Sequence, residues 1–184
     1  MKNLFKISLL LIALLSLSLF SCRSGGQVPE DTSIKVISPT PIPVECKNEM
    51  YPSDAPQFGN NDSVNYQTLQ ENLDFIDIVK GDSQNEVISN DKVEVHYTGW
   101  LFDGCVFDST YPRESTAKFR IGKGQVIKGW DLGILGMKEG GTRRLQIGPN
   151  LAYGKNGIPG VIPENSTLIF EVKLIKIIRL VNNE

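Results

Sequence analysis

Apolar and polar residues alternate in several short stretches between residue 73 and the C-terminus. In residues 91–104, apolar residues stand at positions 93, 95 and 97 and polar residues at 94, 96 and 98, which predicts a half-buried β-strand. Asp103-Gly104 then predicts a hairpin turn into a returning strand at 105–109. We predict further strands at 73–81, 117–122, 142–148 and 166–180, because each is short, alternating and bounded by turn residues.

One stretch has helical spacing instead. In residues 125–141, Trp130, Ile134 and Met137 fall on one side of a predicted helix, which Gly140-Gly141 would end. Many antiparallel strands with one short helix predict an α+β fold, an antiparallel sheet curled around that helix.

The N-terminus has the pattern of an export signal. Lys2 and Lys6 precede an apolar run at 7–20 that is shorter than a comfortable membrane span. The run ends in Ser21-Cys22, which resembles the lipobox of bacterial lipoproteins. We therefore expect residues 1–21 to be a lipoprotein signal peptide and Cys22 to carry a lipid that anchors the chain to a membrane, outside the cytoplasm. The alternative is an ordinary secretory signal with an incidental cysteine.

Residues 22–67 are rich in Pro, Gly and Asn and poor in apolar residues, a composition that predicts a tether. We predict that residues 68–184 form a folded domain. The remaining cysteines, Cys46 and Cys105, make a disulfide possible in an oxidising compartment. Two free thiols, or a tether too mobile to dock, are the alternatives.

Composition excludes several kinds of chemistry. A net charge of −2 with no basic block argues against nucleic-acid binding. One histidine and three cysteines are too few for most zinc sites or for a His-activated nucleophile. His96 lies in the polar phase of a strand, where a structural role is expected, and residues 122–124 lack the third glycine of a dinucleotide loop. The aromatic residues remain, and they indicate either a core or an apolar pocket.

Five segments together resemble the FKBP family of peptidyl-prolyl cis–trans isomerases. They are VEVHYTGWLFDG, VFDS, GQVIKGWDLGILGMKEGG, IGPNLAYG and GIPGVIPENSTLIFEVKLI, in the family's order and spacing between Leu73 and Ile178. The resemblance implies an enzyme that accelerates rotation about Xaa-Pro bonds in proline-containing polypeptides without a metal or cofactor. It implies a pocket with Trp130 as its floor and a wall made by Tyr97, Phe107, Val126, Ile127, Ile162 and Phe170. Asp108 and Arg113 would lie at its polar edge, and Tyr153 and the backbone N–H of Ile127 would hold a flanking carbonyl group.

The sequence differs from the usual pattern of the family at two positions of the pocket rim. Ala117 stands where the family often has a bulky aromatic residue, and Ile158 where histidine is common. Tacrolimus and rapamycin are therefore expected as inhibitors, but weakened ones. The alternative function is a non-catalytic module that clamps a proline-containing segment as a chaperone or adaptor.

Overall fold

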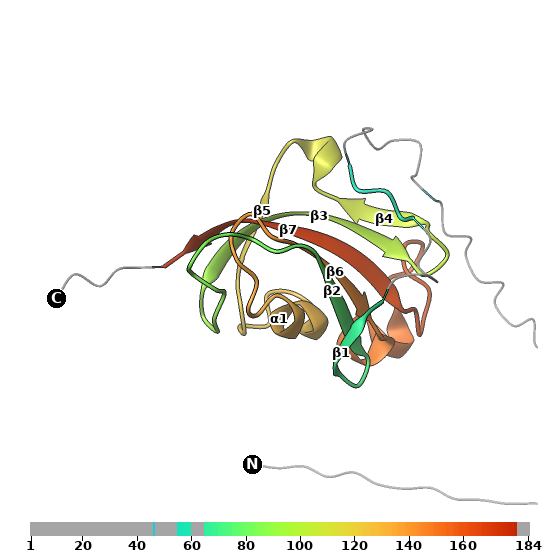
Figure 1. Cartoon of the computed structure of the whole chain (residues 1–184). Helices are drawn as coiled ribbons and strands as arrows, with labels where there is room; N and C mark the ends of the chain where they lie inside the picture. The colour runs from blue at the N-terminus through green and yellow to red at the C-terminus, as the bar shows by residue number, and fades with distance from the viewer. Residues whose placement is uncertain (1–45, 47–54, 60–64, 180–184) are drawn as a thin grey trace, which may run out of the picture. The chain divides into compact units, whose positions relative to one another are not determined.

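A computed structural model describes residues 46, 55–59 and 65–179 of the chain. It confirms the predicted fold class, since seven strands within the described residues form one antiparallel sheet and these residues contain one short α-helix (Figure 1). The strands are β1 (Gln67–Gln70), β2 (Leu73–Val79), β3 (Lys92–Leu101), β4 (Val106–Ser109), β5 (Ala117–Arg120), β6 (Thr142–Ile147) and β7 (Leu168–Ile178). Among the described residues, no helix has the length and apolar character needed to cross a membrane.

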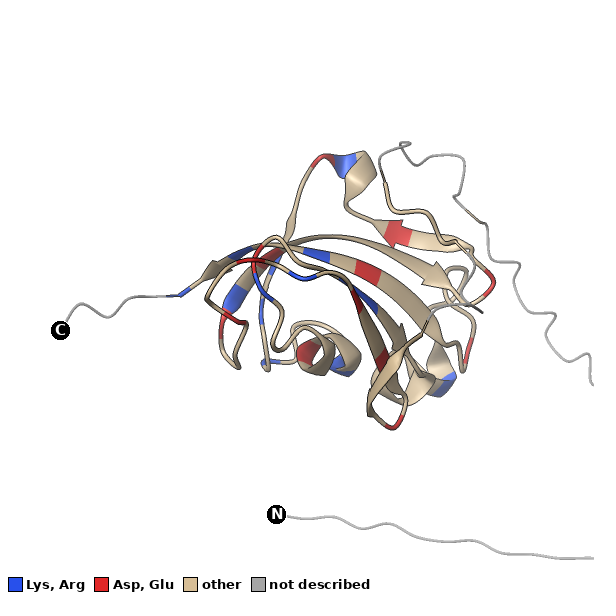
Figure 2. Ribbon diagram, in the orientation of Figure 1, with Lys and Arg blue, Asp and Glu red and all other residues tan. Residues whose placement is uncertain are grey.

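The sheet has the strand order β1-β2-β6-β7-β3-β4, and β5 also pairs with β3. It arches over helix α1 (Lys128–Gly133), so that its concave face and the helix enclose the main core (Figure 1). Leu145, Ile147 and Leu174 are among the fully buried residues of this core. Acidic and basic residues are interspersed along the strands (Figure 2). The described residues thus present charges of both signs on the strands that enclose this core.

Glycines allow α1 to lie close against strand β6. A Cβ atom at Gly133 would lie 2.8 Å from Cδ2 of Leu145, and one at Gly129 would collide with Ile147. Both contacts are with fully buried side chains, which have little room to move. Glycine is a poor helix former, so α1 depends on this packing rather than on intrinsic propensity.

The predicted helix at 125–141 was too long. The structure ends α1 at Gly133, with Ile134 as its C-cap, and Gly136 follows with a φ of +75°. The left-handed conformation of Gly136 prevents the helix from continuing, so α1 ends seven residues before Gly140, where its end was predicted. Residues 140–141 form a later turn. Trp130, Ile134 and Met137 are nevertheless all buried, because the turn after the helix continues along the same core.

Part of the segment expected to be a tether lies on the outer face of the sheet. Ala55 is 3% exposed, and the ring of Phe58 lies 6.0 Å from that of Trp100 on β3. Arg144 on β6 donates hydrogen bonds to the carbonyl oxygens of Gln57 and Phe58. We call residues 55–58 the strap. Strand β1 was also not predicted, since its four residues are all exposed and carry no alternation.

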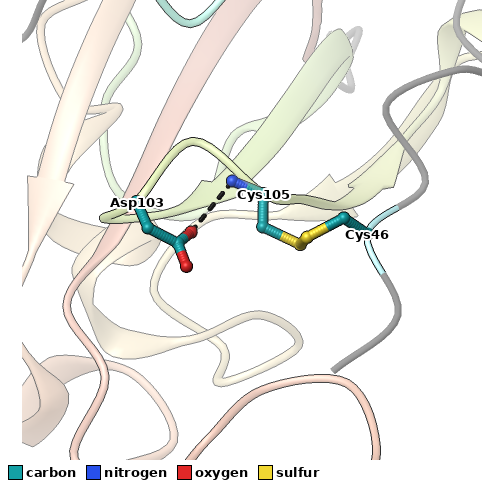
Figure 3. The surroundings of a disulfide bond; sticks show 3 residues. All are labelled: Cys46, Asp103 and Cys105. Carbon is teal, nitrogen blue, oxygen red and sulfur yellow. Dashed lines mark hydrogen bonds between the residues drawn. A yellow bond between two sulfur atoms is a disulfide. The ribbon is translucent and has the colours of Figure 1, made fainter. Parts of the chain in front are cut away.

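A disulfide joins Cys46 to Cys105, the residue between the Asp103-Gly104 turn and β4 (Figure 3). Asp103 Oδ1 accepts a hydrogen bond of 3.0 Å from the backbone N–H of Cys105 and so holds the turn next to the bond (Figure 3). The lipid-bearing Cys22 and the signal peptide predicted at 1–21 lie outside the described residues.

Candidate active site

A recess of about 210 Å³ opens between the concave face of the sheet and the start of α1. Aromatic and aliphatic side chains make most of its surface, and one carboxylate lies at its edge. Its lining residues are Tyr97, Phe107, Asp108, Ala117, Phe119, Gln125, Val126, Ile127, Trp130, Tyr153 and Phe170. A small apolar recess with a few polar groups at one side is typical of a ligand-binding site.

The indole of Trp130 forms the floor because α1 directs it at the middle of the sheet. It is 4% exposed, and three rings surround it at centroid distances of 4.9 Å (Tyr97), 5.4 Å (Phe119) and 5.2 Å (Phe170). Its Nε1–H has no hydrogen-bond acceptor among the described residues. The aromatic cage therefore fixes the plane of the indole without using its polar atom.

A polar edge is built where β3 pairs with β4. The pairing shifts register between Gly99 and Trp100, which places Phe107 and Asp108 side by side at the recess. Asp108 accepts a hydrogen bond from the hydroxyl group of Tyr97 and another, of 2.8 Å, from Nη1 of Arg113. Burial, followed by the bond to Asp108, raises the pKa of Tyr97 above its ordinary value of 10, so this hydroxyl stays a donor. The Asp108 carboxylate in turn raises the pKa of Arg113.

The opposite rim is a loop that α1 holds in place. The two carboxylate oxygens of Asp131 accept hydrogen bonds of 2.8 and 3.0 Å from the backbone N–H groups of Gly122 and Gly124. Both glycines have a positive φ, so the turn at 122–124 is a structural loop. The next residues bring Gln125 to Ile127 to the recess, and the N–H of Ile127 has no acceptor among the described residues.

Tyr153 also lines the recess, directly before the short 3₁₀ turn Gly154–Asn156. Its side chain is 38% exposed, and no described residue forms a hydrogen bond with its hydroxyl group. Partial burial and then the charge of Asp108 raise its pKa above 10. A neutral phenol that points at an open recess is a donor for a carbonyl oxygen of a bound chain.

Most residues predicted for the site lie together. Eight of the ten line the recess, namely Tyr97, Phe107, Asp108, Val126, Ile127, Trp130, Tyr153 and Phe170. Arg113 does not line it but holds Asp108. Ile162, predicted as a wall residue, is instead 3% exposed in the core, where its backbone pairs with Ile158. The rim position Ile158 likewise packs against the core rather than lining the recess.

Two lining residues were not predicted for the site. The alternation of residues 117–122 puts Phe119 on the same face as Ala117, which is the signal that could have found it. Gln125 carries no such signal, since its position follows from the loop at 122–124. His96 has the structural role predicted for it, because its Nδ1 lies 3.0 Å from Oγ1 of Thr110 and its ring stacks near Tyr111.

A larger recess of about 350 Å³ lies between the end of β2 and residues 136–141. Four of the five charged residues in its lining form ion pairs, Arg143 with Asp77 at 2.6 Å and Lys138 with Glu86 at 3.7 Å. Arg143 also donates to the carbonyl oxygens of Gly133 and Leu135 and so ties the end of α1 to β2. These pairs hold the fold together, and we therefore assign the site to the smaller, apolar recess.

Comparison with known proteins identifies the family that has this fold and this kind of recess. The chain belongs to the family described as FKBP-type peptidyl-prolyl cis-trans isomerase, whose sequence model matches residues 83–175. It is 51% identical over 98 residues to "FK506-binding protein 1A" of Neurospora crassa, covering 53% of this chain and 82% of that protein. It is 48% identical over 105 residues to "Peptidyl-prolyl cis-trans isomerase Fkbp12" of Drosophila melanogaster, covering 57% and 97%.

A solved structure is similar over the same region. The crystal structure of AtFKBP13 superimposes with a TM-score of 0.58 at 39% sequence identity, and the match covers 62% of this chain and all of that one (100%). The chain is thus a peptidyl-prolyl cis-trans isomerase, and the recess is where the family resemblance predicted its site.

Proposed function

We propose that this enzyme isomerises Xaa-Pro bonds of proteins outside the cytoplasm, from a lipid anchor at Cys22. The observation that carries the catalytic part is the recess itself, an aromatic cage around Trp130 with hydrogen-bond donors at its edge. The leader pattern predicted at 1–21 supports the setting, and so does the Cys46–Cys105 disulfide, because such bonds persist in oxidising compartments.

Rotation about a prolyl bond needs no covalent chemistry. The barrier of about 18–20 kcal/mol arises from amide resonance, which the twisted transition state has lost. A twisted amide is less polar than a planar one, so an apolar recess that excludes water stabilises it relative to the ground state. Lowering the barrier by about 5 kcal/mol would accelerate the rotation a few thousandfold.

Each part of the recess has a role in this proposal. The proline ring packs against Trp130, while the Tyr153 hydroxyl and the Ile127 N–H donate to carbonyl groups that flank the prolyl bond. Phe107 and its neighbours favour an apolar residue before the proline. Asp108 fixes Tyr97 and Arg113 and so sets the shape and polarity of the edge where the twisting carbonyl lies.

A protease-coupled assay on a peptide with a Leu-Pro bond tests the catalytic proposal. Tyr153→Phe is expected to lower kcat/KM severalfold while the free energy of unfolding stays within about 0.5 kcal/mol, since its hydroxyl group lies at an open edge. Asp108→Ala is expected to lower kcat/KM severalfold as well and to cost about 1–3 kcal/mol of unfolding free energy, because it leaves the Tyr97 hydroxyl group without its acceptor. Asp82→Ala, at an exposed carboxylate away from the recess, is the matched control and should leave both unchanged. If the folded wild-type chain accelerates prolyl isomerisation neither in this peptide nor in the refolding of a protein, the catalytic proposal is wrong. The function would then be that of a non-catalytic module that binds proline-containing segments.

The same recess is proposed to bind tacrolimus and rapamycin competitively. Ala117 provides less apolar wall than an aromatic residue would, so Ala117→Phe is expected to tighten inhibition. The inhibition constant of each drug should be lower for Ala117→Phe than for the wild type. Equal constants would mean that the side chain at position 117 does not contact the drug.

Anchoring is tested by cell fractionation. The wild-type chain is expected in the membrane fraction and Cys22→Ser in the soluble fraction, because two or three acyl chains bind a bilayer far more firmly than one. Membrane association that survives the substitution would contradict a lipid on Cys22.

A further inference from the structure

The recess has two ends because two strands line it along the same edge of β3. Strand β7 pairs with β3 over its whole length, so β4 and β5 share the opposite edge, one at each end (Figure 1). Asp108 on β4 is paired with Gly99, and Ala117 on β5 is paired with Val95. These two residues of β3 are four apart, a distance of about 13 Å along a strand. We call the two parts of the recess the β4 end, which carries Asp108, and the β5 end, which carries Ala117.

Gln125 belongs to the β5 end, and its side chain is held there in one orientation. It lines the recess, and its Oε1 accepts a hydrogen bond of 2.8 Å from the backbone N–H of Arg120, the last residue of β5. A backbone N–H can bond only the oxygen of a carboxamide, so this bond also fixes the position of the amino group. Neither N–H of Nε2 has an acceptor within the part of the chain that the structure describes. Gln125 therefore offers two hydrogen-bond donors at the β5 end.

The charges on both sides of Gln125 in the sequence also favour an acceptor. The Asp131 carboxylate contacts this loop, but backbone N–H groups of the turn at 122–124 occupy both of its oxygens. Lys123 and Lys128 are exposed, and neither forms an ion pair with a described residue. The loop from 123 to 128 thus combines the free donors of a carboxamide with positive charge.

The β4 end has the opposite chemistry. It carries the apolar ring of Phe107 and the carboxylate of Asp108, which accepts hydrogen bonds from Tyr97 and Arg113. The proposed function places the residue before the proline against Phe107 and the proline ring against Trp130. A client chain that crosses the recess in this way reaches the β5 end with the residue that follows the proline. Two residues of extended chain span about 7 Å, and the side chains at either side cover the rest of the distance between the two ends.

We propose that Gln125 is a specificity-determining residue that contacts the client residue after the proline and favours an acidic side chain there, an inference that rests on the proposed function of the recess. A carboxylate accepts hydrogen bonds from Nε2 and is attracted by Lys123 and Lys128. A basic side chain at the same position places a donor against a donor and a charge against like charges. Ala117 adds only a methyl group to this end, which leaves room for the client side chain.

The test compares four peptides that differ only in the residue after a Leu-Pro bond, which is Glu, Gln, Leu or Lys. Exchange between their cis and trans forms is measured by NMR, because a coupled protease would itself respond to this residue. The wild-type chain is expected to give kcat/KM values that fall in the order Glu, Gln, Leu, Lys, with a difference of about tenfold between the Glu and Lys peptides. Equal values for these two peptides overturn the proposal.

Gln125→Glu is the most informative variant. Its carboxylate still accepts the N–H of Arg120, but it replaces the two Nε2 donors by a negatively charged acceptor. The ratio of kcat/KM between the Glu and Lys peptides is expected to fall at least fivefold. Gln70→Glu makes the same chemical change on the exposed strand β1 and is the matched control, which should keep the wild-type ratio. A Gln125→Glu chain with the wild-type ratio, or a Gln70→Glu chain in which the ratio falls equally, overturns the proposal.

The side-chain amide resonances provide a readout independent of catalysis. The Glu peptide is expected to shift the two Nε2 proton signals of Gln125, and the Lys peptide to leave them in place. If the chain isomerises no peptide and these signals still shift with the Glu peptide alone, the catalytic proposal is wrong and the specificity of Gln125 stands. If all four peptides are isomerised at equal rates and the signals do not shift, the proposal for Gln125 is wrong and the catalytic proposal stands.

Discussion

Gly99 of β3 is the position where the smallest change should alter the shape of the recess. It lies under the two rings that form one wall, and a Cβ atom there would lie 2.8 Å from Cζ of Phe107 and 2.8 Å from Cε1 of Phe170. Ordinary van der Waals contact begins at 3.4 Å, so Gly99→Ala must displace these rings by at least about 0.6 Å. Phe107 and Phe170 are 8% and 4% exposed and face the recess, which is the open space available to them.

The expected cost to stability is small because two effects oppose each other. Overpacking of this size costs about 1–3 kcal/mol. Replacing glycine by alanine in a strand recovers about 0.5–1 kcal/mol of chain entropy. We therefore expect Gly99→Ala to lose up to about 2.5 kcal/mol of unfolding free energy and to remain folded. A recess narrowed by the displaced rings should raise the KM for a Leu-Pro peptide roughly five- to tenfold, equivalent to about 1–1.4 kcal/mol of lost contact.

Urea unfolding and the coupled assay, measured on the same preparations, separate the two effects. Ile134→Val is the control, since it removes a buried methylene outside the recess, costs about 0.5–1.5 kcal/mol and should leave KM unchanged. A folded Gly99→Ala chain with the KM of the wild type would refute the reasoning, because it would mean that the two rings do not bound the substrate.

Three further predictions concern stability. Arg143→Ala should lower the free energy of unfolding by about 3–5 kcal/mol in urea titrations, because it leaves Asp77 and two carbonyl groups at the end of α1 without their donor. Reductive loss of the Cys46–Cys105 bond, with a sequence separation of 59 residues, should lower it by up to about 4 kcal/mol, measured with and without a reductant. The side-chain hydrogen bonds from Arg179 hold the pKa of Asp91 below its ordinary 3.8, so the stability that this pairing adds is complete above about pH 4 and is lost as the pH falls through the lower, folded-state value. Asp91→Asn should therefore be less stable than the wild type at pH 7, with a difference that shrinks below pH 4, and a difference independent of pH would contradict this assignment.

Alternation along the strands made the fold and most of the site predictable. It identifies which residues of β3 and β7 face the core, and the turn at 103–104 sets the pairing of β3 with β4. The residues of the site come from places where such local patterns hold, as with Phe107 next to the hairpin and Trp130 on the helix. Ile162 is different, because its exposure depends on how the loop at 158–162 folds onto itself, and a local pattern does not contain that information.

The length of the helix was mispredicted because spacing and propensity disagree after Gly133. Ile134 and Met137 continue the helical spacing, but Gly133 and Gly136 weaken the helix, and the left-handed conformation of Gly136 ends it. A turn that runs along the same core buries the same side chains as a helix would. The apolar spacing therefore predicted burial correctly and backbone conformation incorrectly.

The strap covers Trp100, and the pattern of β3 indicates that this residue is covered. In β3 the polar phase of the alternation holds Glu94, His96 and Thr98, and Trp100 occupies the next position of that phase. A large aromatic residue on the face expected to meet solvent indicates that something covers it, and the structure makes Trp100 1% and Thr98 1% exposed under residues 56–58. The cover itself was not predictable, because its apolar residues are few and not periodic. Its partner Arg144 contacts it across 86 residues of sequence. A large aromatic residue in the polar phase of an otherwise regular strand therefore indicates that the outer face of this sheet is covered at that point.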